Sequence, residues 1–168
     1  MSRTKRQSQW AYAAVAYLER SASKPTLLER SNTMKITIET TVRVSAQEAW
    51  RAWTTPDDIK RWNAASDDWH TTASTVDLRV GGMFSSRMEA KNGSFGFDFA
   101  GTYTKIVPHS LIEMDLSGRT LVVEFIPEGE KVVVRETFDA EESHSLDQQR
   151  QGWQAILDRF ARHVESRR

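Results

Sequence analysis

Residues 145–165 read SLDQQRQGWQAILDRFARHVE and set the architecture expected for this chain. Ser145 followed by Gln148 is a capping box, which predicts that a helix begins here. Beyond it, large and apolar residues recur at spacings of three and four and form one stripe. The stripe consists of Leu146, Gln149, Trp153, Ile156, Leu157, Phe160 and Val164. At 1.5 Å per residue the helix would be roughly 30 Å long, so it needs a large apolar surface to pack against.

The segments before this helix predict that surface. Alternating or β-branched residues between turn signals predict strands, and Asn92-Gly93 predicts a hairpin. The expected strands are residues 35–44, 75–80, 83–90, 95–107, 111–116, 120–126 and 131–138. Ser45 with Glu48 predicts one short helix after the first strand, and Thr55-Pro56 predicts a second, capped by Thr55. The fold class is therefore α+β: a curved antiparallel sheet of six to seven strands wrapped on a long C-terminal helix, a helix-grip architecture.

Several segments, in this order, resemble one known family. They read VSAQEAWRAWTTPDDIKRW (44–62), DLRVGGMF (77–84), GTYTKIVPHSLIEM (101–114) and QGWQAILDRFARHV (151–164). The chain is similar to the START-like SRPBCC superfamily, in the branch named after the activator of heat-shock protein 90 ATPase. The resemblance covers about residues 34–165 and implies the helix-grip fold. It implies no single function, since the superfamily includes lipid carriers, polyketide cyclases and chaperone regulators.

Residues 1–33 differ from the rest of the chain and form an N-terminal extension to a domain of residues 34–168. They begin basic and continue through a short apolar run, residues 10–18. This order resembles a signal peptide, but Glu19 and Arg20 follow at once and no small-x-small cleavage site is present. The segment is instead expected to be weakly ordered or a peripheral helix near residues 7–20. Met34 is an alternative natural start.

Composition limits the partners. Lys and Arg number 23, as do Asp and Glu, so the net charge favours neither nucleic acid nor an anionic membrane. The sequence has no cysteine, which excludes disulfides and thiolate metal sites and fits a cytoplasmic location. No cofactor motif is present: the sequence has neither a P-loop nor a dinucleotide fingerprint. Six Trp and seven Phe are many for 168 residues, and aromatic side chains fill cores or line pockets.

Strand parity predicts which side chains face the long helix. The expected inward sets are Ile112, Met114 and Leu116; Leu121, Val123 and Phe125; and Val132, Val134, Glu136 and Phe138. Glu136 would then be a carboxyl group in an apolar row, which is costly unless it is paired or protonated. It is either a polar anchor for a ligand or a structural hydrogen-bond partner of Trp153 or Arg150.

An aromatic row on the predicted hairpin is the expected pocket wall. It consists of Phe97, Phe99 and Tyr103, with Phe84 and Met88 on the neighbouring strand. The same residues would also serve as a filled core. Gly96 and Gly101 favour a cavity, because a strand glycine removes side-chain volume.

Residues 62–70, WNAASDDWH, are expected to form a loop with two possible roles. In one, Trp62 and Trp69 close the cavity as a lid and His70 acts as an acid or base. In the other, tryptophans anchor a structural loop. A metal site is not predicted, because the spacing of Asp67, Asp68 and His70 matches no standard motif.

Together these observations favour binding of a small hydrophobic molecule, lipid-like, aromatic or polyketide-like, between sheet and helix. The predicted binding residues are Trp62, Trp69, His70, Phe84, Met88, Phe97, Phe99, Tyr103, Met114, Glu136, Trp153, Leu157 and Phe160. One alternative is a polyketide cyclase-like enzyme using His70 or Glu136. Another is a chaperone-activator-like interaction domain. Charges expected on the outer face of the sheet, such as Arg87, Glu89 and Asp98, argue against the apolar patch it needs.

Overall fold

The computed structural model describes residues 33–167 as one curled sheet with three helices. The predicted extension and its peripheral helix lie outside the described residues. In chain order the elements are β1 (Lys35–Val42), α3 (Ala46–Thr54), α4 (Pro56–Trp62), β2 (Trp69–Val76), β3 (Met83–Ala90), β4 (Gly96–Val107), β5 (Leu111–Leu116), β6 (Arg119–Glu128), β7 (Lys131–Asp139) and α5 (Leu146–Glu165).

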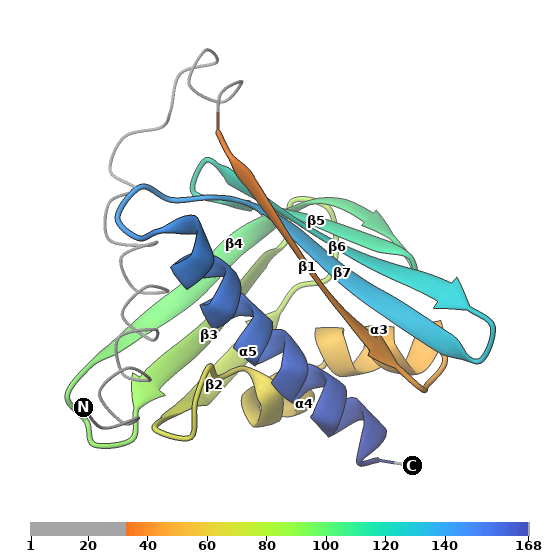
Figure 1. Ribbon diagram of the computed structural model, residues 1–168, viewed down its shortest axis with the longest axis horizontal. Helices are drawn as coiled ribbons and strands as arrows, with labels where there is room; N and C mark the ends of the chain where they lie inside the picture. Colours follow the sequence, from red (N-terminus) through yellow and green to blue (C-terminus); the bar gives the residue numbers. More distant parts are fainter. Residues whose placement is uncertain (1–32, 168) are drawn as a thin grey trace.

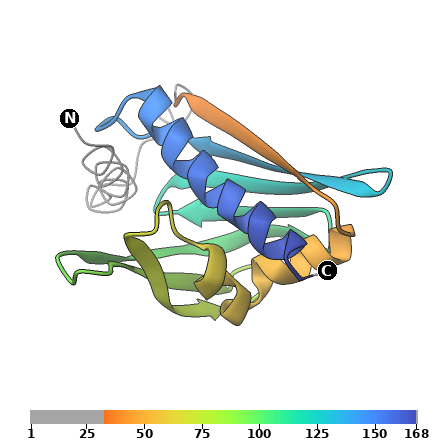
Figure 2. The same ribbon diagram turned by 60° about the horizontal axis from the view of Figure 1, so that its bottom comes forward.

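The strands form one 7-stranded antiparallel sheet in the order β1-β7-β6-β5-β4-β3-β2. Register shifts interrupt β2 after Thr71 and β4 after Tyr103, and such irregularities increase the bend of a sheet. The long helix α5 crosses the concave face of the sheet (Figure 1). In Figure 2, α5 lies across the opening of the curl, with β1 on one side and β2 on the other. The predicted helix-grip fold is confirmed.

The core lies between this concave face and the helices. The inward sets predicted by parity on β5, β6 and β7 are all buried, Glu136 included. From α5, the side chains of Leu157 and Phe160 are fully buried against them. Alternation along each strand therefore gave the correct face, because the outward positions between these residues are partly exposed for most of β5 and β6.

Helix starts are defined by capping. Ser45 accepts a hydrogen bond from the Glu48 amide and the Glu48 side chain bonds back to the Ser45 amide, and Ser145 with Gln148 does the same at α5. Both capping boxes are confirmed. Thr55 precedes α4, but its side chain makes no capping bond. The predicted side-chain cap is wrong there, because the Asp58 amide, which such a cap would bond, donates to the Thr55 carbonyl at 3.1 Å instead.

The predicted strand at residues 75–80 and the loop before it are wrong. The strand β2 begins at Trp69 and ends at Val76, and it pairs along β3 from Ala90 to Phe84. β2 reads WHTTASTV, and its threonines and serine suit a strand with one solvated face. Residues 77–82 instead form a turn, in which the Arg79 amide bonds the Asp77 carbonyl at 2.8 Å.

Candidate functional site

A cavity opens between the sheet and the helices. Its volume is about 80 Å³. A single water needs roughly 10–15 Å³ measured in the same way, so the space holds more than isolated waters. The 17 lining residues are Trp53, Ile59, Trp62, Asn63, Thr75, Val76, Phe84, Ser86, Met88, Phe97, Phe99, Tyr103, Met114, Leu121, Glu136, Trp153 and Ile156.

One wall of the cavity comes from β3 and β4. Phe84 lies between Phe99 and Tyr103, with ring centroids 5.6 and 5.4 Å away. All three side chains project from the concave face, because Phe84 pairs with Gly101 in register and inward positions alternate. Further along, Met88 and Phe97 pack with Trp69 in a smaller cluster. The wall is thus a continuous aromatic surface.

The opposite wall comes from the helices. The rings of Trp53 on α3 and Trp62 on α4 lie 4.9 Å apart. The Trp62 indole nitrogen donates to the Ala52 carbonyl at 3.1 Å, which fixes its ring. On α5, Trp153 stacks on Phe138 with a centroid distance of 4.1 Å and an interplanar angle of 17°. These contacts hold the aromatic side chains in place without a ligand.

Glu136 is the only Asp, Glu, Lys, Arg or His among the described residues that line the cavity. It projects from β7 between Ile38 of β1 and Val123 of β6, and it is only 4 % exposed. Burial alone raises the pKa of its carboxyl group to about 8. The structural alternative involving Arg150 is wrong, since that guanidinium donates to the Thr37 carbonyl at 2.7 Å instead. Within residues 33–167, no hydrogen bond or ion pair to the Glu136 side chain is found.

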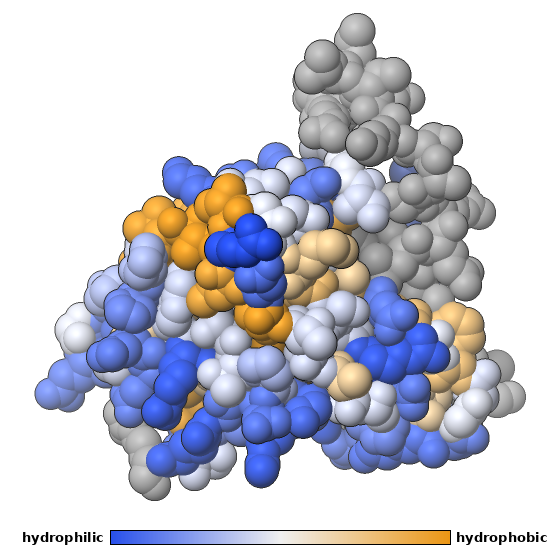
Figure 3. Space-filling model, turned by 180° about the vertical axis from the view of Figure 1, so that it is seen from behind, coloured by the Kyte–Doolittle hydropathy of each residue, from blue (hydrophilic) through white to orange (hydrophobic). Residues whose placement is uncertain are grey.

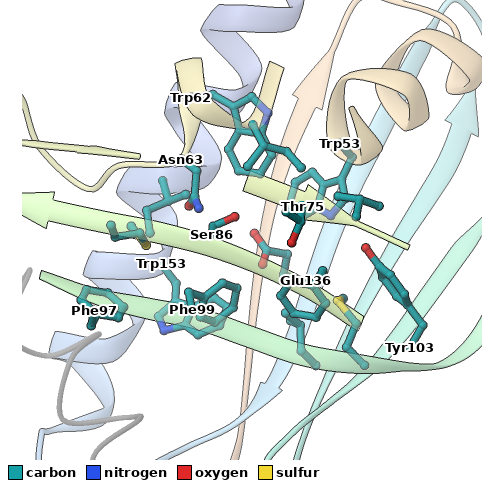
Figure 4. Close-up of a pocket in the computed structure, with 17 residues that line it drawn as sticks. Trp53, Trp62, Asn63, Thr75, Ser86, Phe97, Phe99, Tyr103, Glu136 and Trp153 are labelled. Atoms are coloured by element: carbon teal, nitrogen blue, oxygen red, sulfur yellow. The ribbon is translucent and has the colours of Figure 1, made fainter. Parts of the chain in front are cut away.

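A few other polar groups share the cavity with this carboxyl. Ser86 and Glu136 point toward each other from facing strands, with Thr75 beside them (Figure 4). The Ser86 hydroxyl also lies 3.3 Å from the Ser74 hydroxyl. Burial, with a smaller contribution from Asp77, raises the pKa of Tyr103 to about 12, so this phenol stays protonated. The arrangement is a mainly apolar space with polar groups gathered around Glu136.

The structure brings most of the predicted binding residues to this cavity. Those that line it are Trp62, Phe84, Met88, Phe97, Phe99, Tyr103, Met114, Glu136 and Trp153. Leu157 and Phe160 lie outside the lining, because they are fully buried in the core. Trp69 is also outside it and packs behind Phe97, with a centroid distance of 5.9 Å.

The predicted lid of residues 62–70 takes a different form. Trp62 ends α4, whereas Trp69 and His70 belong to β2. His70 pairs with Glu89 and falls between buried Trp69 and Thr71, so it lies on the outer face of the sheet. It is not a lining residue, so the structure does not bring it to the cavity with the other predicted residues. On a strand, a residue that stands between two buried neighbours has its side chain on the opposite face.

Sequence reasoning missed several lining residues. These are Trp53, Ile59, Asn63, Thr75, Val76, Ser86, Leu121 and Ile156. Two signals were available: Ser86 stands between Phe84 and Met88 with period two, and Ile156 belongs to the apolar stripe of α5. Trp53, Ile59 and Asn63 depend on how α3 and α4 pack on the sheet, which no local pattern specifies.

The two strand glycines do not open the cavity as predicted. A Cβ atom on Gly101 would lie 2.7 Å from the Asp115 carbonyl oxygen and 2.8 Å from a Leu116 methyl group. A Cβ atom on Gly96 would lie 2.8 Å from the Arg87 guanidinium, which is on the outer face. Both glycines permit close packing of neighbouring groups, which is the other use of glycine in a strand.

The outer face of the sheet carries both charged and apolar side chains. Arg87 pairs with Glu89 at 3.0 Å and with Asp98 at 3.6 Å, as expected for an exposed cross-strand cluster. Figure 3 views this side and shows hydrophobic surface beside hydrophilic surface. Exposed apolar side chains include Val80 in the turn before β3, at 62 % exposure, and Met83 at the start of β3, at 63 %. The expected charges are therefore present, with apolar side chains exposed close to them.

Residues 33–167 contain neither a membrane-spanning helix nor a group of side chains suited to a metal ion. None of the described helices is both long enough and apolar enough to cross a membrane. Likewise, in this part of the chain no three His, Cys, Asp or Glu side chains are grouped so as to hold a metal ion.

The curled sheet, the gripping helix and the cavity between them define a START-like helix-grip domain. A family model described as "Activator of Hsp90 ATPase homolog 1-like protein" matches residues 43–165. The chain belongs to this family, within the SRPBCC superfamily, and the resemblance inferred from the sequence is confirmed.

Solved structures agree with this assignment. The chain is similar to an AHSA1-like protein from Aeromonas hydrophila, with 50% identity and a TM-score of 0.76, over 80% of this chain and 94% of that one. It is similar to a protein from Cytophaga hutchinsonii at 39% identity and a TM-score of 0.70, over 79% and 93%. A Chromobacterium violaceum protein at 19% identity and a TM-score of 0.71, over 79% and 98%, shares the fold. The comparison with curated proteins gives no match.

Proposed function

We propose that this protein binds a small, largely apolar molecule in the cavity between the sheet and α5. One observation carries the proposal: an open cavity with an aromatic and aliphatic lining and a few convergent polar groups. Small-molecule sites typically have this same composition. Lipid-like, aromatic and polyketide-like molecules all fit this description. The cysteine-free sequence supports a cytoplasmic location as part of the same proposal.

The energetics favour binding by a preformed site. Removing ligand surface from water contributes about 25 cal/mol per Å² of apolar area, before the cost of ordering the ligand. The protein's own ordering cost is small, because Trp62 and Trp153 are already held by Ala52 and Phe138. Affinity then depends on how well the ligand fills the aromatic space.

Ligand screening by thermal shift and tryptophan quenching tests the proposal. We expect compact apolar molecules such as 1-naphthylmethanol to raise the melting temperature and quench fluorescence in a saturable way. The variant Ser86→Phe would fill the cavity and abolish both effects. The matched control is Ser85→Phe on the same strand, where the side chain faces outward and binding should persist.

The result that contradicts the proposal is a folded wild-type protein that gives no saturable response to any molecule of the screen. Equal binding by the Ser86→Phe and Ser85→Phe variants would place binding elsewhere on the protein. The alternatives predicted from the sequence, a cyclase-like enzyme and a chaperone-activator-like interaction domain, rest on resemblance alone. His70 cannot assist Glu136 in the cyclase-like alternative from its position on the outer face.

A further inference from the structure

Buried carboxyl groups in the described residues fall into two kinds. Three have cationic or ionisable partners within hydrogen-bond distance. They are Asp58 with His163, Asp139 with Lys35, and Glu141 with His144, at 2.9, 2.6 and 2.6 Å. Glu136 is equally buried, but in residues 33–167 no side chain pairs with it. The cavity occupies the space beside its carboxyl group, where a partner would lie (Figure 4).

The charges of the lining are unbalanced. Among the lining residues that the structure describes, Glu136 is the only acidic one, and none of these 17 is a lysine, arginine or histidine. A carboxylate or phosphate on a ligand would therefore be desolvated with no counter-charge, which is strongly unfavourable. A cation would find one carboxylate within a low-dielectric space, where an ion pair is stronger than in water.

The groups around Glu136 also suit a cation. Aromatic rings of Trp53, Trp62, Phe99 and Trp153 surround the space in front of the carboxyl (Figure 4). Aromatic faces attract cations through the ring quadrupole, and the attraction increases when both groups are desolvated. The Ser86 hydroxyl beside the carboxyl provides an oxygen that accepts a further N–H bond. One ammonium group would thus pair with the Glu136 carboxylate and also interact with the aromatic rings and the Ser86 hydroxyl.

We propose that the cavity selects ligands that carry a single ammonium group on a compact apolar body, and that Glu136 is the counter-ion. This inference rests on the proposed function, because it names the chemical class of the ligand for the same cavity. An isosteric alcohol binds more weakly, since it lacks the charge. An isosteric carboxylate binds most weakly, because its negative charge is desolvated with no counter-charge among the described lining residues.

Binding of an ammonium ligand would be coupled to release of the Glu136 proton. Because burial raises the pKa of Glu136 to about 8, the empty cavity holds a carboxylic acid at neutral pH. An ammonium favours the carboxylate, so binding breaks the carboxyl O–H bond and releases that proton to the buffer. Affinity for the amine therefore rises by up to about tenfold per pH unit between pH 6 and 8 and then levels.

Of the other ionisable groups near the cavity, Tyr103 alone is among the described lining residues. Tyr103 is the second titratable lining residue, and burial keeps it protonated, with a pKa of about 12. Asp77, which contributes to that shift, is in the exposed turn before β3. On α5, Arg150 bonds the Thr37 carbonyl outside the cavity, and His163 pairs with Asp58 on α4. The pH dependence is thus assigned to Glu136.

The experiment compares 1-naphthylmethylamine, 1-naphthylmethanol and 1-naphthoate by tryptophan quenching and calorimetry from pH 6 to 8.5. At pH 8 we expect the amine to bind the wild-type protein at least about tenfold more tightly than the alcohol, and naphthoate to bind most weakly. Calorimetry in buffers of different ionisation enthalpy should show release of close to one proton at pH 6.5. In Glu136→Gln the amine preference and the pH slope disappear, while the affinity for the alcohol is retained.

The outcomes separate this inference from the proposed function. Saturable alcohol binding without an amine preference, or an amine affinity that is flat with pH, overturns the charge selection and leaves the proposed function intact. Alcohol affinity that falls above pH 8 while the amine gains nothing also overturns it, because Glu136 then acts as a neutral donor. Failure of all three molecules overturns both proposals. The wild-type pH series needs no variant, and Glu136→Met provides a second substitution at the same position.

Discussion

The two halves of the interface between α5 and the sheet are packed in different ways. In the C-terminal half, Phe160 is fully buried and its ring lies 4.9 Å from Trp53 and 5.2 Å from Trp62. Nearer the N-terminal end, Trp153 and the mid-helix residue Ile156 are only partly buried and border the cavity. A single apolar stripe therefore supports a solid core at one end and an open space at the other.

The carboxyl groups of the two halves differ in the same sense. At the solid end, Asp58 of α4 accepts hydrogen bonds from His163 and Arg167 of the C-terminal segment. At the open end, Glu136 has no such partner among the described residues. The buried Asp58 carboxyl is therefore compensated by its partners, whereas the buried Glu136 carboxyl keeps the cost of its desolvation.

Removing a large side chain from each half is the most direct test of the difference in packing between them. Phe160→Ala deletes a fully buried ring at the solid end, and we expect a loss of about 3–5 kcal/mol in the free energy of unfolding. Phe99→Ala removes a partly buried ring that already borders empty space, so its loss should be about 1–2 kcal/mol. Urea unfolding of both variants measures the difference. Equal losses would mean that the two ends are packed alike.

The pH dependence of Glu136 is the next largest effect. Burial raises its pKa from the ordinary 4.5 to about 8. Between these values the unfolded chain has lost the proton and the folded protein retains it, so this group's contribution to stability falls as pH rises. Glu136→Gln lacks the titration. Its stability relative to wild type should increase by on the order of 1 kcal/mol per pH unit from about pH 5 to pH 8.

Urea unfolding of wild type and Glu136→Gln at matched pH values checks this expectation. The matched control is Glu113→Gln on β5, which makes the same change at a carboxyl that faces outward, and its difference from wild type is measured at each pH for comparison. A difference for Glu136→Gln that follows this control at every pH would mean that the Glu136 carboxyl is not desolvated in the folded protein.

Most of the fold could be predicted because its signals are local. The capping boxes at Ser45 and Ser145 and the alternation along β5, β6 and β7 depend only on neighbours in the sequence. The start of β2 was missed for the opposite reason. Trp69 enters the sheet by pairing with Ala90, and a polar threonine-rich strand looks like a loop until its partner is known.

The site was predictable only in part. Parity placed Glu136 on the inward face, and period two placed Phe84 and Phe99 in one wall. Whether an inward residue borders space or packs solidly depends on how three helices meet the sheet. Phe160 and Trp153 lie on one stripe of α5, yet the first is core and the second is cavity wall. That distinction is a tertiary property with no local signature.

A smaller effect is expected at the ionic contact of the solid end. Asp58→Asn removes the charge that His163 and Arg167 contact, and we expect a loss of about 1–2 kcal/mol. The value is discounted, since the Arg167 side chain is 46% exposed and solvent screens its charge. Thermal unfolding at low and high salt measures it. Stabilisation by Asp58→Asn would show that this carboxyl, like Glu136, is held at a cost.

The smallest predicted difference concerns the two capping boxes, which have the same chemistry at α3 and α5. Ser45→Ala removes the only side-chain cap found at a helix of nine residues, and it should cost about 1–2 kcal/mol.

Ser145→Ala should cost less, about 0.5–1 kcal/mol, because Gln149 independently ties the start of α5 to the preceding loop. The Gln149 side chain accepts from the Glu141 amide at 2.8 Å and donates to the carbonyls of Glu141 and His144, both at 2.9 Å. Urea unfolding of Ser45→Ala, Ser145→Ala, Gln149→Ala and the double variant Ser145→Ala with Gln149→Ala tests this redundancy. If Gln149 supports the helix start, the double variant loses more than the sum of the two single changes. Additive losses would mean that the cap and the Gln149 network act on separate parts of the open end.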